Sequence, residues 1–338
     1  MRVKKYLSGI LALALAFQTG AWDVPAAQVQ KAADSATQVV SEPETVYVNE
    51  YGANEREVSF NDNWRFYLGE LNGAEAAVYN DSAWRNVDLP HDYSIDQGFT
   101  TAAPAEQESG YVLGGTGWYR KGFTLSEELA DKKVSVEFDG VYMNATVFLN
   151  GEQLGTHPNG YAPFAFELPS ELLHFGRGEN VLAVKVDHKQ PSSRWYSGSG
   201  IYRDVTLTVT EPVHVAYHGT TVTTPDIDEG VGTVQVVADI ENGGSQDETV
   251  SIRQVVYEAE GKEPVAVGEK TQAQLVLAGQ KASIAGTVTV ASPKLWTTEE
   301  PNLYTVRTEV YVGDTLTDTY ESDFGFRWAT FTKDSGFF

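Results

Sequence analysis

The residues best suited to metal or nucleophilic chemistry are few and scattered along this sequence. The chain has no cysteine, which excludes disulfides, thiolate metal sites and cysteine nucleophiles. Its 6 histidines are not closely paired, so the sequence predicts no zinc site. The run from Asp226 to Gly230 carries carboxylates but lacks the other ligands of a calcium loop, and is interpreted as a solvated turn. We therefore expect no metal and no cofactor.

Three other polar features are interpreted as functional or structural: one histidine, one triplet and one pair of charged residues. His157 stands alone on a predicted hairpin and is interpreted as structural. The triplet Asn144-Ala145-Thr146 fits a glycosylation site, but such triplets are common by chance, and this one is placed inside a predicted strand. Arg203 and Asp204 are predicted to form an ion pair at the start of a strand. None of these positions indicates a reaction by itself.

The charge of the chain restricts its partners. The formal net charge is −23, with 47 acidic residues against 24 Lys and Arg. A chain this acidic is repelled by nucleic acid and by anionic lipid. We expect no nucleic-acid partner, and interpret the charge as favouring solubility.

The first residues are typical of an export signal. Arg2, Lys4 and Lys5 precede an apolar run of 11 residues from Leu7 to Phe17, shorter than the roughly 20 residues of a membrane span. Small residues follow, and Thr19-Gly20-Ala21 offers a cleavage site. We predict a signal peptide over residues 1–21, a linker over 22–54, secretion or cell-surface localisation, and no membrane association beyond export. The alternative is a buried helix.

Residues 55–211 have the alternation of β-strands. In the stretch 134–139 the apolar side chains occupy every second position, as they do in a strand with one buried face. Residues 145–149 form a second such stretch, and Asn150-Gly151 after it supplies the positive φ angles of a tight hairpin. Residues 181–186 and 205–209 are further predicted strands. Short strands separated by Gly and Pro turns predict a sandwich or barrel.

A second β domain is predicted after Glu211-Pro212, because proline cannot donate to a strand ladder. About seven strands are predicted in this block, among them residues 234–240, 250–252, 275–277, 287–290 and 304–310. That number in a block of this length is typical of an immunoglobulin-like sandwich. The predicted fold class is therefore all-β, with a jelly-roll sandwich over 55–211 and an immunoglobulin-like sandwich over 212–330.

Motifs in the expected order make the sequence resemble the N-terminal part of family 2 glycoside hydrolases, most similar to the β-galactosidases. The segments that carry the resemblance in the first domain are residues 63–66, 84–92, 117–123, 140–164, 178–184 and 193–205. In the second domain they are Leu295-Trp296-Thr297, Pro301 to Tyr304, and Phe324 to Arg327. The resemblance covers residues 55–338.

The resemblance implies a catalytic (β/α)8 barrel with a glutamate acid/base and a glutamate nucleophile, about 5 Å apart in a retaining mechanism. No βαβ alternation is visible, and residues 331–338 resemble the lead-in to the first barrel strand. We therefore expect this chain to be an N-terminal fragment of an exported enzyme, to contain no catalytic residue, and to be inactive alone.

The resemblance also implies that the first domain lends a loop to the rim of the barrel site, matching residues 193–203 here. Arg194 would offer planar donors to sugar hydroxyls, and Trp195 a flat apolar face to the ring. Asp92 would accept a hydrogen bond from a substrate hydroxyl. The alternatives are a core Trp with a surface Arg, and a turn aspartate bonded to its own backbone. Some β-galactosidases place an aspartate near the Arg194 position, and its lack here leaves an equivalent sodium site in doubt.

Several functions remain open from the sequence. The first hypothesis is a β-galactoside-hydrolysing enzyme with a carbohydrate substrate as its partner. The run Arg194 to Gly200 favours this over β-glucuronidase or β-mannosidase activity. The second is a free-standing, non-catalytic carbohydrate-binding module. The third, a surface adhesin, lacks the repeats and the wall anchor usual for that class.

Overall fold

The computed structural model describes residues 46–48, 55–192, 195–228, 230–259, 261–327 and 331–337. The chain divides into residues 1–42 and 43–338, and all described residues belong to the second unit. The predicted signal peptide over 1–21 and most of the predicted linker lie outside the described residues. Within the described part, no helix is both long and apolar enough to cross a bilayer.

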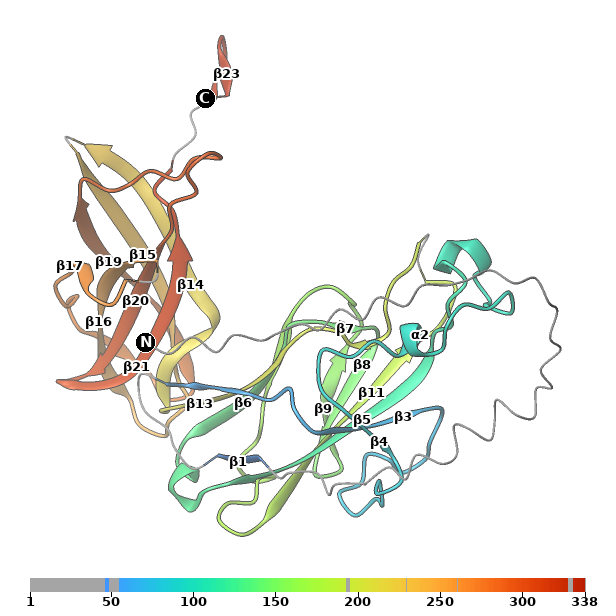
Figure 1. The fold of residues 1–338 in the computed structure, drawn as a ribbon. Coiled ribbons are helices and arrows are strands. Elements are labelled where there is room, and N and C mark those ends of the chain that lie inside the picture. The colour runs from blue at the N-terminus through green and yellow to red at the C-terminus, as the bar shows by residue number, and fades with distance from the viewer. Residues whose placement is uncertain are drawn as a thin grey trace, which may run out of the picture. The chain divides into compact units, whose positions relative to one another are not determined.

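The first domain is a sandwich of two sheets, and can be followed by its strand labels in Figure 1. The larger, seven-stranded sheet has the order β4-β3-β5-β11-β8-β9, with β1 also pairing with β5. Its strands are β1 (Val46–Val48), β3 (Trp64–Leu68), β4 (Arg85–Val87), β5 (Gly115–Leu125), β8 (Ala145–Leu149), β9 (Glu152–His157) and β11 (Glu179–His188).

The smaller sheet of this domain has the order β10-β6-β13-β2. Its strands are β2 (Glu57–Ser59), β6 (Lys133–Phe138), β10 (Phe164–Glu167) and β13 (Val205–Thr210). A separate pair joins β7 (Val141–Tyr142) to β12 (Gly200–Ile201). The helical elements are short: α2 (Tyr93–Asp96), η1 (Glu106–Ser109) and η2 (Glu127–Leu129). This arrangement confirms the predicted jelly-roll sandwich.

Alternating side chains of both sheets form the core of the first domain. Along β6, Val134, Val136 and Phe138 are buried, while the residues between them face outward. Buried residues of β5, β8, β11 and β13 join the same apolar cluster. The predicted hairpin is present, because Asn150 and Gly151 have φ angles of 52° and 96° between β8 and β9.

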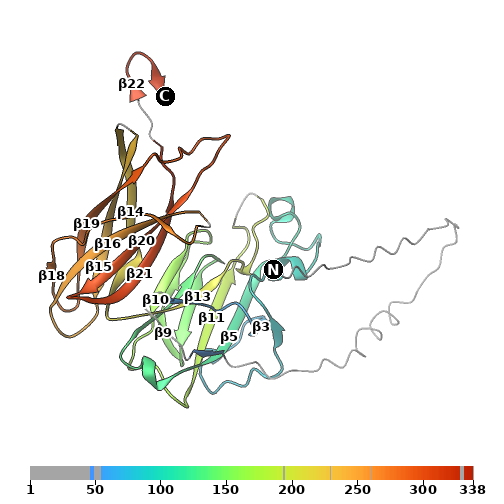
Figure 2. The same ribbon diagram turned by 60° about the vertical axis from the view of Figure 1, so that its left-hand side comes forward.

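The second domain is a sandwich of a three-stranded and a five-stranded sheet, labelled from two sides in Figures 1 and 2. The first sheet contains β14 (Val213–Asp228), β15 (Val231–Asn242) and β19 (Gln280–Ala291). The second contains β16 (Glu248–Glu258), β17 (Pro264–Val267), β18 (Gln274–Val276), β20 (Tyr304–Val312) and β21 (Thr315–Phe324). A terminal hairpin joins β22 (Phe331–Thr332) to β23 (Gly336–Phe337). The immunoglobulin-like architecture predicted for this block is confirmed.

Three local predictions are wrong. The run 226–230 is not a turn throughout, because residues 226–228 belong to β14 and pair with β15. Asn144 does not lie inside a strand: its φ is 49°, it precedes β8, and its amide donates to the Asp187 carbonyl. Arg203 and Asp204 do not pair with each other. Arg203 donates to the carbonyls of Asp139 and Tyr161, while Asp204 accepts from the Asn61 amide. Residues 203 and 204 precede β13 and belong to no strand, and their hydrogen bonds hold the two side chains to different partners, which separates the two charges.

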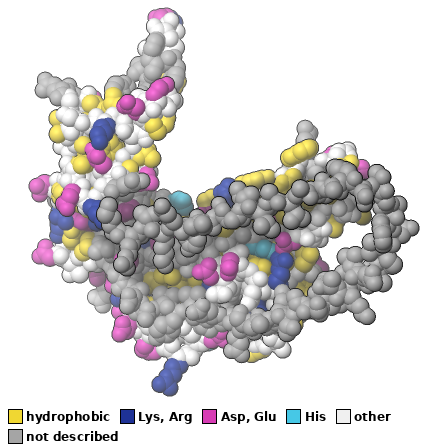
Figure 3. All heavy atoms as spheres, in the orientation of Figure 1, with side chains coloured by type: hydrophobic (Ala, Val, Ile, Leu, Met, Phe, Trp, Pro, Cys, Tyr) yellow, Lys and Arg dark blue, Asp and Glu magenta, His cyan; other side chains and the backbone are white. Residues whose placement is uncertain are grey.

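The acidic side chains are spread over the face of the molecule that Figure 3 shows. Figure 3 shows Asp and Glu scattered over the visible face of both domains and not gathered at one spot. This distribution agrees with the interpretation of the charge as a general solvated surface.

Candidate functional site

Asp92 connects two segments that are far apart in the sequence. Its carboxylate caps the short helix α2 by accepting from the backbone N–H of Ser94 at 2.9 Å. The same oxygen, Oδ1, accepts from the backbone N–H of Ser199, also at 2.9 Å, and the Tyr196 hydroxyl donates to Oδ2. Asp92 therefore fastens the segment 196–199 to the start of α2.

The Tyr196 hydroxyl remains an uncharged donor to Asp92 over the physiological pH range. Burial raises the pKa of the Tyr196 phenol, and the adjacent Asp92 carboxylate raises it further. Gly198 allows this close approach, because a Cβ there would lie 2.7 Å from Asp92 Oδ2. The alternative interpretation of Asp92 as a turn aspartate thus describes one of its bonds, and the structure adds two bonds from residues more than a hundred positions away.

Trp195 lies next to the clamped Tyr196, and 71% of its surface is exposed. It is not the core tryptophan of the alternative interpretation. Ser193 and Arg194 lie outside the described residues. Of the three predicted site residues, the structure thus places Trp195 directly before the segment 196–199, which Asp92 fastens.

A buried polar layer lies beneath this segment. The Ser199 hydroxyl contacts the hydroxyl of Ser94 and Nδ1 of His188, and Nε2 of His188 is 2.7 Å from the Ser192 hydroxyl. Burial lowers the pKa of His188, so the ring is neutral at neutral pH. Ser199 is fully buried and cannot reach a substrate, so this serine–histidine contact supports the loop and is not a hydrolytic pair.

His91 is held by a second network on the other side of Asp92. Its Nδ1 lies 2.8 Å from the Tyr119 hydroxyl and its Nε2 lies 3.1 Å from Asp96, which also pairs with Arg85. Burial lowers the pKa of His91. A neutral, doubly bonded imidazole fixes the backbone that precedes Asp92 and has no free nitrogen for proton transfer.

Sequence reasoning missed Tyr196, Ser199, His188 and Ser94 as supports of this loop. No spacing signal could have found them, because the partners come from strands and loops distant in the sequence. His157, interpreted as structural, stacks on Phe164 with 4.2 Å between ring centroids. Within the described residues, no cluster of three His, Asp or Glu side chains could hold a metal ion.

The named loop groups are suited to contacts with a ligand and not to proton transfer. An exposed indole can stack on a sugar ring, and the fastened loop can hold that indole in place. The two histidines are neutral, and the carboxylate of Asp92 is occupied by three donors.

Family models match nearly all of the described chain. The sugar-binding domain of glycosyl hydrolases family 2 matches residues 54–212, and a second model of glycosyl hydrolases family 2 matches residues 213–327. The chain belongs to glycoside hydrolase family 2. The two matched ranges meet between β13 and β14, where Pro212 separates the sandwiches.

Curated relatives of this family 2 chain have two different names. A β-galactosidase of Bacteroides ovatus, BoGH2A, is 40% identical over 82% of this chain and 32% of its own length. A β-glucuronidase of Formosa agariphila is 30% identical over 82% of this chain and 30% of its own length. The chain therefore spans about a third of these relatives.

Solved structures of the family share the fold. A glycosyl hydrolase family 2 member from Bacteroides cellulosilyticus matches with a TM-score of 0.77 and 33% identity, over 84% of this chain and 37% of that one. A family 2 β-glucuronidase matches with a TM-score of 0.75 and 29% identity, over 84% and 31%.

Proposed function

We propose that this chain is the N-terminal part of an exported, retaining glycoside hydrolase that acts on β-galactosides. In this proposal a barrel domain outside the printed sequence supplies the two catalytic glutamates, and the segment 193–203 contributes to the rim of the sugar site. Arg194 and Trp195 contact the sugar there. Asp92 belongs to the same rim, where it fastens the loop or accepts a hydrogen bond from a sugar hydroxyl. The observation that carries the proposal is the exposed Trp195 beside a loop fastened by Asp92.

The substrate choice has support from two sides. The relative at 40% identity is named a β-galactosidase, and the run Arg194 to Gly200 favours the same activity. The second candidate is β-glucuronide hydrolysis, favoured by the β-glucuronidase relative and by the β-glucuronidase structure with a TM-score of 0.75. A free-standing carbohydrate-binding module is the third, because the fold of the first domain suits it without any barrel.

The test compares two proteins: one extended past Phe338, and one that consists of residues 22–338. A protein extended past Phe338 by its genomic frame is expected to hydrolyse nitrophenyl β-galactoside in preference to nitrophenyl β-glucuronide, because the barrel holds the paired carboxylates. Residues 22–338 are expected to hydrolyse neither. Preference for the glucuronide would transfer the proposal to the second candidate. A stop codon directly after Phe338 would favour the binding module.

Removing the exposed indole should weaken substrate use in the extended protein. Trp195→Ala is expected to lower kcat/KM on nitrophenyl β-galactoside about tenfold, equal to about 1.4 kcal/mol of transition-state binding. Leu275→Ala, which removes an exposed apolar side chain on β18 in the second domain, is the control and should retain the parent kcat/KM. Equal kcat/KM values for Trp195→Ala and the parent protein would exclude Trp195 from the sugar site.

A further inference from the structure

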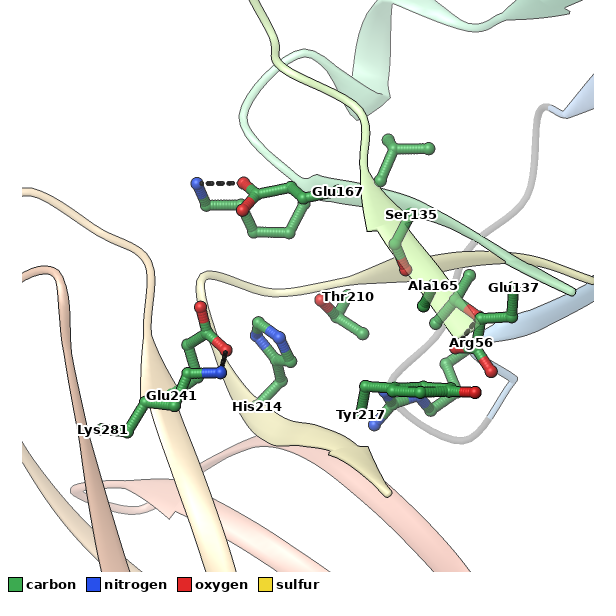
Figure 4. Close-up of a pocket in the computed structure, with 13 residues that line it drawn as sticks. Arg56, Ser135, Glu137, Ala165, Glu167, Thr210, His214, Tyr217, Glu241 and Lys281 are labelled. Atoms are coloured by element: carbon green, nitrogen blue, oxygen red, sulfur yellow. Dashed lines mark hydrogen bonds and ion pairs between the residues drawn. The ribbon is translucent and has the colours of Figure 1, made fainter. Parts of the chain in front are cut away.

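A pocket of about 210 Å³ is lined by no described residue of the segment 193–203. It lies between the outer face of the small sheet of the first domain and strands β14, β15 and β19 of the second domain. Figure 4 shows the side chains that surround it. Because alternate residues of a strand point to opposite faces, the outward residues of β6 and β13 line one wall, including Ser135, Glu137 and Thr210. His214 and Tyr217 of β14 line the other wall.

The three cations around this pocket are each paired with a carboxylate. The lining has three cations and three anions, Arg56, Lys133, Lys281, Glu137, Glu167 and Glu241. Lys133 pairs with Glu167 at 3.0 Å. Lys281 pairs with Glu241 at 2.7 Å, as a dashed line in Figure 4 marks. Arg56 pairs with Asp318 at 2.7 Å. Glu137 accepts from the Thr208 hydroxyl at 2.8 Å and has no ion pair among the described residues. An anionic ligand would have to displace a carboxylate from its cation, so the lining disfavours an anion and suits a neutral ligand with hydroxyl groups.

Several hydrogen-bonding groups in the same pocket have no partner among the described residues. They are the hydroxyls of Ser135, Thr210 and Tyr217, and Thr210 is 97% buried. Nδ1 of His214 faces the carbonyls of Glu211 at 2.9 Å and Pro212 at 3.3 Å, so Nδ1 carries the proton and Nε2 remains as an acceptor. The pocket thus offers hydroxyl donors, acceptors and one aromatic ring, from two domains at once.

The size of the pocket restricts the ligand further. A volume of about 210 Å³ lies below the range of about 300–1,000 Å³ typical of drug-sized ligands. That volume suits a ligand of about one sugar ring. We propose that this pocket is an accessory site for one neutral pyranose residue, bound by Thr210, Ser135 and His214 against the ring of Tyr217.

The test is a titration of the chain with methyl β-galactopyranoside, followed by amide chemical shifts in NMR. Saturable shifts on β13 and β14 are expected, with a Kd on the order of 1 mM. Thr210→Val keeps the shape of the side chain and removes only the hydroxyl, and Tyr217→Ala removes the ring. Each is expected to weaken binding at least tenfold.

Thr206→Val is the matched control, because Thr206 lies on the same strand and the same face of β13 but outside the lining. It should bind like the parent chain. An unchanged Kd in a folded Thr210→Val protein, or the absence of saturable shifts in the parent chain, would overturn the proposal. Tighter binding of inorganic sulfate than of the sugar at these same strands would also overturn it, since the pocket would then select an anion. Because none of these measurements needs hydrolysis, their result is independent of the catalytic proposal.

Discussion

Asp318→Asn is expected to lower the free energy of unfolding by about 3 kcal/mol at pH 7, because it leaves a buried guanidinium without its counter-charge. Asp318 lies on β21 and is fully buried, and its Oδ2 accepts from Arg56 at 2.7 Å and from the Val215 backbone N–H at 2.8 Å. Arg56 is 9% exposed and also packs over the Tyr320 ring. The asparagine amide oxygen can still accept from the Val215 N–H, so the loss of stability reports the missing negative charge alone. The free energy of unfolding is measured by urea denaturation.

The opposite substitution should cost less. Arg56→Met leaves Asp318 buried, but a carboxyl group can take up a proton, whereas a guanidinium cannot lose one. Burial already raises the pKa of Asp318 from 3.8 to about 6, with Arg56 opposing that rise. Without Arg56 the pKa rises further. The double variant Arg56→Met, Asp318→Asn should recover most of the stability lost in Asp318→Asn, and failure to recover it would show that unpaired charge is not the cause.

The pH dependence follows from the direction of this shift. The folded-state pKa of Asp318 exceeds its unfolded value, so the folded state binds more protons between about pH 4 and pH 6. The stability that comes from proton uptake by the Asp318 carboxyl is therefore present at low pH and is lost as the pH rises through the folded pKa, whereas the stability that comes from the ion pair with Arg56 requires the ionised carboxylate and is present at pH 7. In Arg56→Met the stability should increase more steeply from pH 7 to pH 5 than in the parent chain. A decrease over that range relative to the parent would contradict the assignment.

Gly200→Ala is expected to lower the free energy of unfolding by about 3 kcal/mol or more. Gly200 begins β12 with a φ of 118°, and a Cβ there would overlap the Tyr119 hydroxyl and lie 2.7 Å from the His91 carbonyl oxygen. Tyr119 is fully buried and hydrogen-bonded to His91, so a shift of its ring would disrupt packing and a hydrogen bond. Backbone strain and overpacking each cost about 1–3 kcal/mol.

Gly115→Ala separates these two causes. Gly115 has nearly the same φ, 115°, but the nearest atom to its Cβ would be Leu68 Cδ1 at 3.9 Å. It therefore reports backbone strain without overlap, and should be destabilised less than Gly200→Ala by about 1 kcal/mol or more. Equal losses in the two variants would mean that contact with Tyr119 and His91 carries no cost. In the extended protein, Gly200→Ala should also raise KM, because Gly200 follows the Ser199 amide that Asp92 holds.

Local patterns predicted the elements of this protein because they act over a few residues. Alternation along 134–139 and 145–149 predicted β6 and β8, and Asn150-Gly151 predicted the hairpin, since both signals depend only on the side-chain period of a strand and on positive φ angles. The same short range explains the failure at Arg203 and Asp204. Neighbouring opposite charges suggested a pair, but each side chain finds a different partner in the folded chain.

The candidate site was only partly visible in the sequence. Composition and motif order marked the segment around Trp195 and the position of Asp92, but not what holds them. Tyr196 and Ser199 reach Asp92 across 104 and 107 positions, and Arg56 reaches Asp318 across 262. Such partners are chosen by how the two sheets and the two sandwiches pack, because a buried polar group must find a partner wherever packing places one.

The sequence by itself determined the strand pattern, the break at Pro212 and the family resemblance. Only the tertiary structure decided which donors fasten the Trp195 loop, which carboxylate pairs with Arg56, and where hydroxyls meet around a pocket. Side-chain alternation depends only on the order of neighbouring residues, whereas these contacts depend on the packing of segments more than a hundred residues apart.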